Sequence, residues 1–351
     1  MFHIPGHSGY LPGLAANRDR RAATRILGSV CAAALCVVMT GCGSPGNDTA
    51  AGSGSDPGGS LTIAMQQDIA FSPLYIVKQE HWLDRALPHV KVTWDVLSSG
   101  AAIQTGMISD QINVGALGVA PFLLGQAKGV PWKLLSSLSE SNQSLVVKRS
   151  ITSFSKITPR DRIAVVSPTS IEAVALAKMA AAHLGKNAAL TPNMVTMTQP
   201  EAAQAFDAGS VAGVVAVQPY TSQEIRHGGH VLDTSFQEFG KSTLDSTVVN
   251  TSYYRSHPAI CKALFTQIKR AITLLSTRPS QAARILAAYY HGAEPVSALR
   301  ADITDSSQTW TTVPRGYLRY AGFMKQAGLL SAAPRTMGAL EEPTLAGTPG
   351  N

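Results

Sequence analysis

Residues 60–97, SLTIAMQQDIAFSPLYIVKQEHWLDRALPHVKVTWDVL, decide the fold class. The pattern predicts a short strand in SLTIAM and a second strand, with alternating apolar residues, in HVKVTWDVL. Between them, FSPLYIVKQEHWL has Leu74, Val77 and His81 at helical spacing, which predicts a helix. A strand, a helix and another strand in this order are typical of an α/β sheet.

The same alternation continues along the chain. Helices are predicted in GAAIQTGMIS, APFLLGQAKG, IEAVALAKMAAAHLG and PEAAQAFDAG, and strands in INVGALG, PWKLLSSLS, SLVVK, RIAVV, MVTMT, GVVAVQPY and STVVNTSYY. From Pro258 to Leu330 the pattern is nearly all helical. This order favours parallel-dominated α/β sheets, in which ligands gather at the carboxyl ends of the strands.

The first 41 residues have the pattern of an export signal. Arg18, Arg20, Arg21 and Arg25 precede the apolar stretch Ile26–Met39. A helix of this length reaches about 21 Å, less than the roughly 30 Å of hydrocarbon in a bilayer, which favours a signal over a membrane span. The alternatives of a short buried helix and of twin-arginine export, from Arg20-Arg21, remain open.

Residues 42–60 are rich in Gly, Ser, Pro and Asp and predict a flexible tether. With Cys31 and Cys36 inside the export signal, no disulfide framework is expected. Cys261 lies in a helical pattern and is predicted to be a small buried residue. The net charge of the chain is +7, and the part that follows the predicted signal has a net charge of +4. There is no Lys/Arg run, so a nucleic-acid partner is not expected.

Two resemblances complete this picture. The segment VMTGC, residues 38–42, resembles the lipobox of bacterial lipoproteins, which implies cleavage before Cys42 and a lipid on its thiol. Residues 71–139, 162–185, 205–220 and 248–287 together resemble the solute-binding proteins of bacterial ABC importers. The group in question handles nitrate, sulfonates, taurine and pyrimidine precursors of thiamine.

This second resemblance implies a periplasmic-binding-protein type II fold, with two α/β lobes, a ligand cleft and two hinge crossings near Ser139–Lys148 and Leu244–Thr251. The implied domains are a signal peptide at 1–41, a tether at 42–60, a discontinuous first lobe at 61–145 and 248–335, a second lobe at 146–247 and a tail at 336–351. Glu341 and Glu342 in this tail are expected to be solvated.

The chain departs from the family pattern at two places. Asp110 and Asn113 in SDQINVG replace a glycine and an aspartate; Asp tolerates the left-handed backbone region that glycine favours there. In VAVQPY, Val217 and Gln218 stand where relatives often have Trp and Glu. The second lobe is therefore expected to present a less charged wall.

The candidate ligand-binding residues come from loops at the predicted strand ends. Hydroxyls and free backbone N–H groups at helix starts can point at one anionic or polar group, although helix capping alone also explains them. Tyr75 and Trp132 are expected in the core. The candidates are Gln67, Phe71, Ser72, Ser98, Ser99, Gly100, Ala101, Gly118, Pro121, Ser167, Thr169, Ser170, Gln218 and Tyr220.

No catalytic or cofactor motif is found, and His227-Gly-Gly-His230 is interpreted as a surface turn and not as a metal site. The resemblance therefore implies a monomeric lipoprotein, not an enzyme, on the outer face of the cytoplasmic membrane. It would deliver a small solute, with anions among the candidates, to an ABC permease. Two alternatives remain: an enzyme of the same fold acting on thiamine-pyrimidine or chorismate-derived compounds, and a solute sensor that does not transport.

Overall fold

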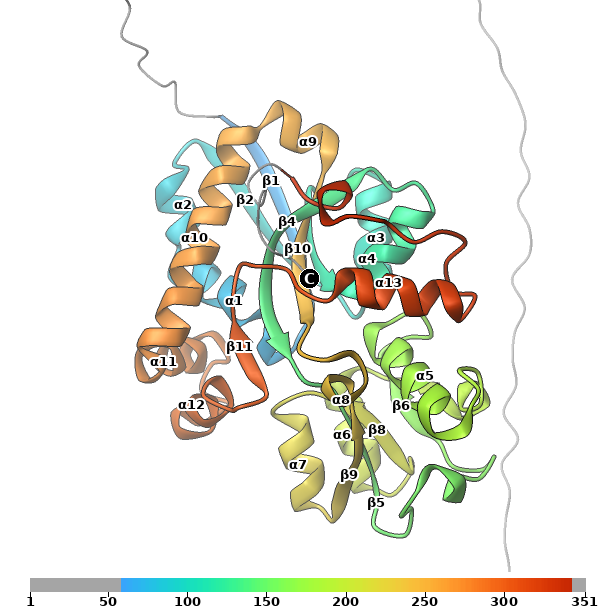
Figure 1. Cartoon of the computed structure of the whole chain (residues 1–351). Coiled ribbons are helices and arrows are strands. Elements are labelled where there is room, and N and C mark those ends of the chain that lie inside the picture. The colour runs from blue at the N-terminus through green and yellow to red at the C-terminus, as the bar shows by residue number, and fades with distance from the viewer. Residues whose placement is uncertain (1–57, 343–351) are drawn as a thin grey trace, which may run out of the picture. The chain divides into compact units, whose positions relative to one another are not determined.

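The computed structural model describes residues 58–342, which contain two β-sheets (Figure 1). The first sheet has the strand order β11-β4-β10-β3-β1-β2. Its strands are β1 (Gly59–Met65), β2 (Val90–Val96), β3 (Val114–Gly118), β4 (Trp132–Ser141), β10 (Thr243–Asn250) and β11 (Gln308–Trp310). Because β1 begins at Gly59, the last two residues of the predicted tether are part of a strand.

The second sheet has the order β7-β6-β8-β5-β9. Its strands are β5 (Ser144–Lys148), β6 (Ile163–Val165), β7 (Met194–Thr196), β8 (Gly213–Ala216) and β9 (Gly229–Thr234). Strand β9 was not predicted, because its first two residues, Gly229 and His230, were interpreted with His227 and Gly228 as a turn. Gly228 makes that turn at a φ of 93°, and β9 starts at the next residue.

The two sheets share one design, and both are mixed. In each, one strand pairs antiparallel with a strand that arrives from the other sheet: β3 pairs with β10 in the first sheet, and β8 pairs with β5 in the second. Pairs β1–β2, β1–β3, β6–β7 and β6–β8 are parallel, and the pairs that involve β10 or β5 are antiparallel. The prediction of parallel-dominated sheets was wrong at these strands, because an arriving strand runs opposite to its neighbours.

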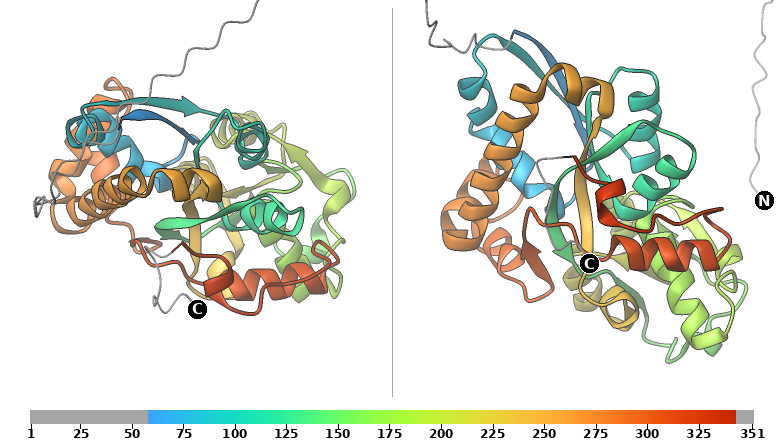
Figure 2. Two further views of the ribbon diagram at one scale, coloured as in Figure 1. Left: turned by 90° about the horizontal axis from the view of Figure 1, so that it is seen from above. Right: turned by 45° about the horizontal axis from the view of Figure 1, so that its top comes forward.

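Helices cover both faces of the first sheet (Figure 1; Figure 2). One core includes residues of α1 (Ser72–Gln79), α2 (Trp82–Ala86), α9 (Thr251–Ser256), α10 (Pro258–Thr277), α11 (Pro279–Tyr289) and α12 (Val296–Ile303). The single helix predicted before β2 is split at His81, whose φ is 50°. As predicted, Tyr75 and Cys261 are buried here, and α10 packs on this sheet.

The other core includes residues of α3 (Gly100–Ile108), α4 (Val119–Ala127) and α13 (Tyr317–Gln326). Trp132 is buried in it, as predicted, and its ring stacks on Phe122 at 5.9 Å between centroids. A Cβ at Gly125 would lie 2.0 Å from the Trp132 ring, so glycine is what lets α4 approach this side chain.

The second sheet also lies between helices. On one face α5 (Ile171–Leu184) packs with the short turn η2 (Phe154–Lys156), and on the other α6 (Gln199–Asp207) and α7 (Tyr220–Arg226) pack together. Helix α8 (Ser235–Phe239) follows β9 and meets α13 of the first sheet, where Phe239 stacks on Tyr320 at 3.9 Å. Three further one-turn helices are η1 (Ile69–Phe71), η3 (Thr191–Asn193) and η4 (Met337–Ala339).

The segment 336–342 is part of the fold, which corrects the prediction of a solvated tail. Leu134 of β4 donates to the Leu340 carbonyl at 2.8 Å, and Glu342 N donates to the Leu134 carbonyl at 2.9 Å. Met337 and Leu340 enter the core beside α4 and α13. Glu341 and Glu342 are consequently buried.

The chain passes from the first sheet to the second between Ser141 and Ser144, inside the predicted first crossing. It returns between Thr234 and Thr243. The second crossing, predicted at Leu244–Thr251, was wrong in position, because those residues already pair with β3 and β4 as strand β10. None of the helices described is both long and apolar enough to cross a bilayer. The predicted signal, lipobox and Cys42 lie outside the described residues.

Candidate functional site

Three adjoining cavities lie where the strands of both sheets end. The first, of about 260 Å³, is lined from the first sheet by Gln66–Asp68 and Val96–Ser98, and from the second by Val166 and Thr198–Pro200. The second, of about 240 Å³, lies between Tyr220 of α7 and Tyr290 beyond α11. Carboxyl ends of strands are the usual place for ligands in α/β proteins.

The third cavity is narrow, about 20 Å³, and lies deeper between the sheets. Its walls include Gly118 and Asp245 of the first sheet and Ser167 and Glu172 beside the second. Asp68 lines all three cavities, so they form one cleft that meets at this residue. We call this set of cavities the cleft.

Three carboxyl groups face one another in the cleft. Burial, with the charge of Glu172, raises the pKa of Asp68 to about 7 against the hydrogen bond that Ala70 N donates to its Oδ1 at 2.7 Å. Burial also raises the pKa of Glu172, although the Ser170 hydroxyl opposes this. The pKa of Asp245 is well above its usual range because of burial and of the charges of Asp68 and Glu172. Each group therefore resists ionisation of the others.

Asp245 lies at an irregularity in the pairing of β10 with β4. The register between β10 and β4 shifts on both sides of Asp245, which is a β-bulge. Bulges re-aim side chains near binding sites, and here the residue is only 3% exposed while it lines the narrow cavity.

Two more acids, Glu294 and Asp302, line the cavity beside Tyr220. Burial, with the charges of Glu294 and Asp305, raises the pKa of Asp302 to about 6. Among the residues that line the three cavities, five are acidic and none is Lys, Arg or His. The lining residues thus include carboxyl groups and no basic side chain, although the charge of Arg226 opposes the rise in the pKa of Asp302.

Nine of the fourteen residues predicted from the sequence line the cleft: Gln67, Ser98, Gly100, Ala101, Gly118, Pro121, Ser167, Ser170 and Tyr220. Their role in ligand binding stays a prediction. The other five are placed elsewhere. Phe71 and Ser72 are wholly buried, the first in the core and the second with its hydroxyl donated to the Ile69 carbonyl at 2.6 Å.

Three more predicted residues do not line the cleft and instead form hydrogen bonds with residues close to them in the sequence or the fold. These residues are Ser99, Thr169 and Gln218. Ser99 Oγ accepts from Ala102 N at 3.3 Å and caps α3, and Thr169 contacts Ser167. Gln218 Oε1 accepts from Ser222 N at 3.3 Å, and its Nε2 reaches Asp305. Ser170 both caps α5, through Ala173 N, and lines the cleft, so capping and exposure to the cavity coexist there.

The sequence reasoning missed the acids. Asp68 lay inside a loop that was singled out, but its charge was not used. Glu172 was interpreted as part of a helix, and Asp245 lay just before the predicted strand 246–254. Asp68 follows the end of β1, and Asp245 lies near the start of β10. An acidic residue close to the end of a strand is the sequence signal that marks both.

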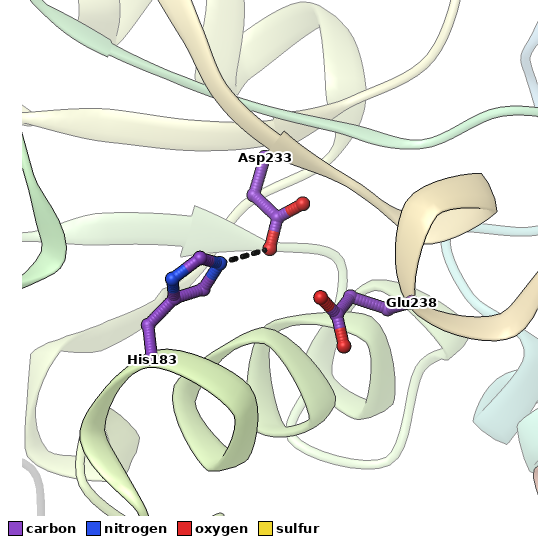
Figure 3. Close-up of side chains that lie close together, drawn as sticks. All are labelled: His183, Asp233 and Glu238. Carbon is purple, nitrogen blue, oxygen red and sulfur yellow. Dashed lines mark hydrogen bonds and ion pairs between the residues drawn. The ribbon is translucent and has the colours of Figure 1, made fainter.

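A second cluster lies beside the second sheet, where His183, Asp233 and Glu238 offer ligand atoms within 4.8 Å of one another (Figure 3). His183 Nε2 and Asp233 Oδ2 are 2.9 Å apart, and Glu238 Oε2 lies 3.8 Å from Lys178 Nζ. The His183 ring also stacks on Phe154 at 4.3 Å. Since each side chain already has a protein partner, this cluster ties α5 to β9 and α8.

Comparison with known proteins gives the family. The sequence profile of the NMT1-like family matches residues 56–289, about two thirds of the chain. The chain belongs to the NMT1-like family.

Two curated relatives resemble this NMT1-like chain. The taurine-binding periplasmic protein of Escherichia coli is 29% identical over 178 residues, 49% of the chain and 53% of that protein. The putative aliphatic sulfonates-binding protein of Bacillus subtilis is 30% identical over 208 residues, 56% of the chain and 60% of that protein. The chain thus spans somewhat over half the length of each.

Among solved structures, the alkanesulfonate-binding protein SsuA of Xanthomonas axonopodis, bound to MOPS, matches with a TM-score of 0.66 and 18% identity. The match covers 82% of the NMT1-like chain and 96% of that protein. This likeness, with that of other neighbours, confirms the predicted α/β fold of periplasmic binding proteins.

Proposed function

We propose that the protein is the extracytoplasmic solute-binding component of an ABC importer. The observation that carries the proposal is the cleft, whose walls come from both sheets at their strand ends. The relatives named above are a taurine-binding protein and a putative aliphatic sulfonates-binding protein, which supports a small solute as ligand. A membrane permease would receive the solute.

Each sheet with its helices forms one lobe in this proposal, with the boundaries predicted above moved to the crossings 141–144 and 234–243. A solute that contacts both lobes has higher affinity for the closed arrangement and shifts the population toward it. The two crossings are the places where backbone rotation would occur.

The test is a solute screen on the chain from Gly54 onward, read by thermal unfolding and by small-angle X-ray scattering. A ligand is expected to raise the Tm and to lower the radius of gyration together, because binding to the native state alone stabilises it. Sulfonates, taurine, nitrate, pyrimidines and small amines make up the panel. A screen in which no solute changes either quantity would overturn the proposal.

Export and lipidation of Cys42 are part of the same proposal. Cells expressing the full chain are labelled with a fatty-acid probe, and the chain is expected to carry the label and to fractionate with membranes. The Cys42→Ser variant is expected to lose both. A full chain that stays unlabelled beside a labelled control lipoprotein would remove the anchor from the proposal.

A further inference from the structure

We propose that the solute bound in the cleft carries a positively charged nitrogen, which is held between Asp68, Glu172 and Asp245. This inference rests on the proposed function and names the ligand class of the same site. It sets the chain apart from receptors for simple anions, although the sequence had placed anions among the candidates.

Asp245 is the first observation. It is 97% buried and lines the narrow cavity. Among the described residues, no hydrogen bond or ion pair is found for its carboxylate, and the two charges that bear on it are acidic. Burial removes much of the hydration of this carboxyl group, which makes its ionised form costly. A donor from outside the protein would remove that cost.

Neighbouring groups add acceptors and no cations. Glu172, 7% exposed, begins α5 on the opposite side of the same cavity. In the adjoining cavity Gln199 is 5% exposed, and its Nε2 donates to the Val215 carbonyl at 3.1 Å. Its Oε1 has no hydrogen-bond partner within residues 58–342. An ammonium has three donors and no acceptor, which matches this set.

Charge decides between ligand classes. A sulfonate or nitrate in the narrow cavity would lie beside three carboxyl groups with no Lys, Arg or His on the walls. Free N–H groups at the starts of α3 and α5 favour anions by about 0.3–1 kcal/mol each. A unit charge about 4 Å away in a partly buried site interacts with several kcal/mol. Once ionised, the carboxyl groups therefore outweigh the helix ends, and a bound cation both favours their ionised form and satisfies their hydrogen bonds.

The experiment compares matched probes by calorimetry and thermal unfolding of the chain from Gly54 onward. Taurine and isethionate differ in one group, an ammonium in the first and a hydroxyl in the second. Ethanolamine and 1,4-diaminobutane carry ammonium groups without a sulfonate, and nitrate is the anion control. Probes with an ammonium are expected to bind, and isethionate and nitrate to bind at least tenfold more weakly.

Asp245→Asn is the test variant, since it removes the charge and keeps the shape. It is expected to weaken the binding of the amines about ten- to hundredfold. Its Tm without ligand is expected to equal or exceed that of the wild type, because an uncompensated buried acid is removed, and this separates lost binding from failed folding. The matched control is Asp84→Asn on exposed α2 surface, which is expected to leave binding unchanged.

The pH dependence of ligand affinity gives an independent test. A cation needs ionised carboxylates, so amine affinity is expected to rise between pH 5.5 and 8 as Asp68, with its pKa of about 7, loses its proton. An anion would bind more weakly over the same range.

The outcomes separate the two proposals. If an anion alone binds and closes the lobes, the importer role stands and the cation inference is overturned. If only the ammonium probes bind, both are supported. If no probe of either charge binds, the cation inference falls, and the importer role stands or falls with the wider solute screen described above. Equal binding of taurine and isethionate, or an Asp245→Asn variant with unchanged affinity for the amines, also overturns the inference.

Discussion

The fold accommodates two departures from the family pattern, Asp110 and Asn113, because each side chain forms a hydrogen bond. Asp110 takes the left-handed conformation expected of the glycine it replaces, with a φ of 56°, and its Oδ1 accepts from Asn250 Nδ2 at 3.1 Å. Asn113 Oδ1 accepts from Thr62 N at 2.8 Å, a bond that an aspartate would also make. The neutral amide therefore keeps β1 joined to β3.

At the same scale, Gly125 and Gly322 are two helical glycines with opposite expected responses to alanine. Gly125→Ala places a methyl group 2.0 Å from Trp132 and is expected to cost about 1–3 kcal/mol of stability. Gly322 has open space at its Cβ position, so Gly322→Ala is expected to stabilise α13 by up to about 1 kcal/mol. Chemical denaturation measures both; equal effects would contradict the packing described.

Glu224 is buried in α7, and both of its carboxylate oxygens lack a partner among the described residues. Burial, followed by the charge of Asp207, raises its pKa to about 8. The folded state thus holds a proton that the unfolded chain releases above about 4.5, and the stability from this group falls as pH rises from 4.5 to 8.

Glu224→Gln is expected to remove this part of the pH dependence. At pH 8 the variant should be about 1–3 kcal/mol more stable than the wild type, because the wild type then holds an unpaired buried charge. Urea unfolding at pH 5 and pH 8 gives the comparison. Two pH profiles that run parallel would mean that Glu224 has a partner in solution.

At the scale of elements, the segment 336–342 tests whether the end of the described chain holds the first sheet together. Leu340 is 2% exposed in the core, whereas Leu329 is 44% exposed. Leu340→Ala is expected to cost about 2–5 kcal/mol, and Leu329→Ala less than about 0.5 kcal/mol. Thermal unfolding compares the two variants. A small loss of stability in Leu340→Ala would mean that the segment is solvated in solution, as the sequence predicted.

Helices and strands with strong periodicity were predictable, and those without it were not. The stretch IEAVALAKMAAAHLG gave α5 nearly residue for residue, and GAAIQTGMIS gave α3. Strand β11 has three residues and was missed inside a region interpreted as helix. Helix α7 was missed because Gln218-Pro219-Tyr220 was interpreted as the end of a strand. Short elements are determined by their neighbours in space, which local pattern does not contain.

The site was partly predictable for the same reason. Loops at strand ends are fixed by α/β topology, and nine residues named from them line the cleft. What the pattern could not give is that Asp245 belongs to β10 and lines the cavity, because the predicted strand began one residue later, at Ser246. The acids came together only through pairing of distant strands.

At the scale of the whole molecule, Gly118 lies where the two proposed lobes meet, and we expect it to set how closely they approach. A Cβ at this position would lie 3.0 Å from Ile171 Cγ2, at the start of α5 on the opposite lobe. Gly118→Val is expected to hold the lobes apart, to weaken ligand binding about tenfold or more and to abolish ligand-induced compaction. X-ray scattering measures the compaction.

Ile171→Ala, added to Gly118→Val, makes room for the new side chain and is expected to restore part of the compaction. The pair therefore separates a steric block between lobes from damage to β3. If the double variant unfolds at the same temperature as the wild type and still fails to compact, another contact limits closure.

In the proposed mechanism, strand β10 links ligand recognition to lobe movement. It begins at Thr243, where the second crossing ends, and Asp245 is its third residue. In the proposed mechanism, a cation that draws Asp245 toward Glu172 pulls directly on the peptide that would pivot. Ligand binding would then change the angle between the lobes directly, without a series of rearrangements in the core. A permease in contact with both lobes would distinguish the ligand-bound protein from the free protein by this angle.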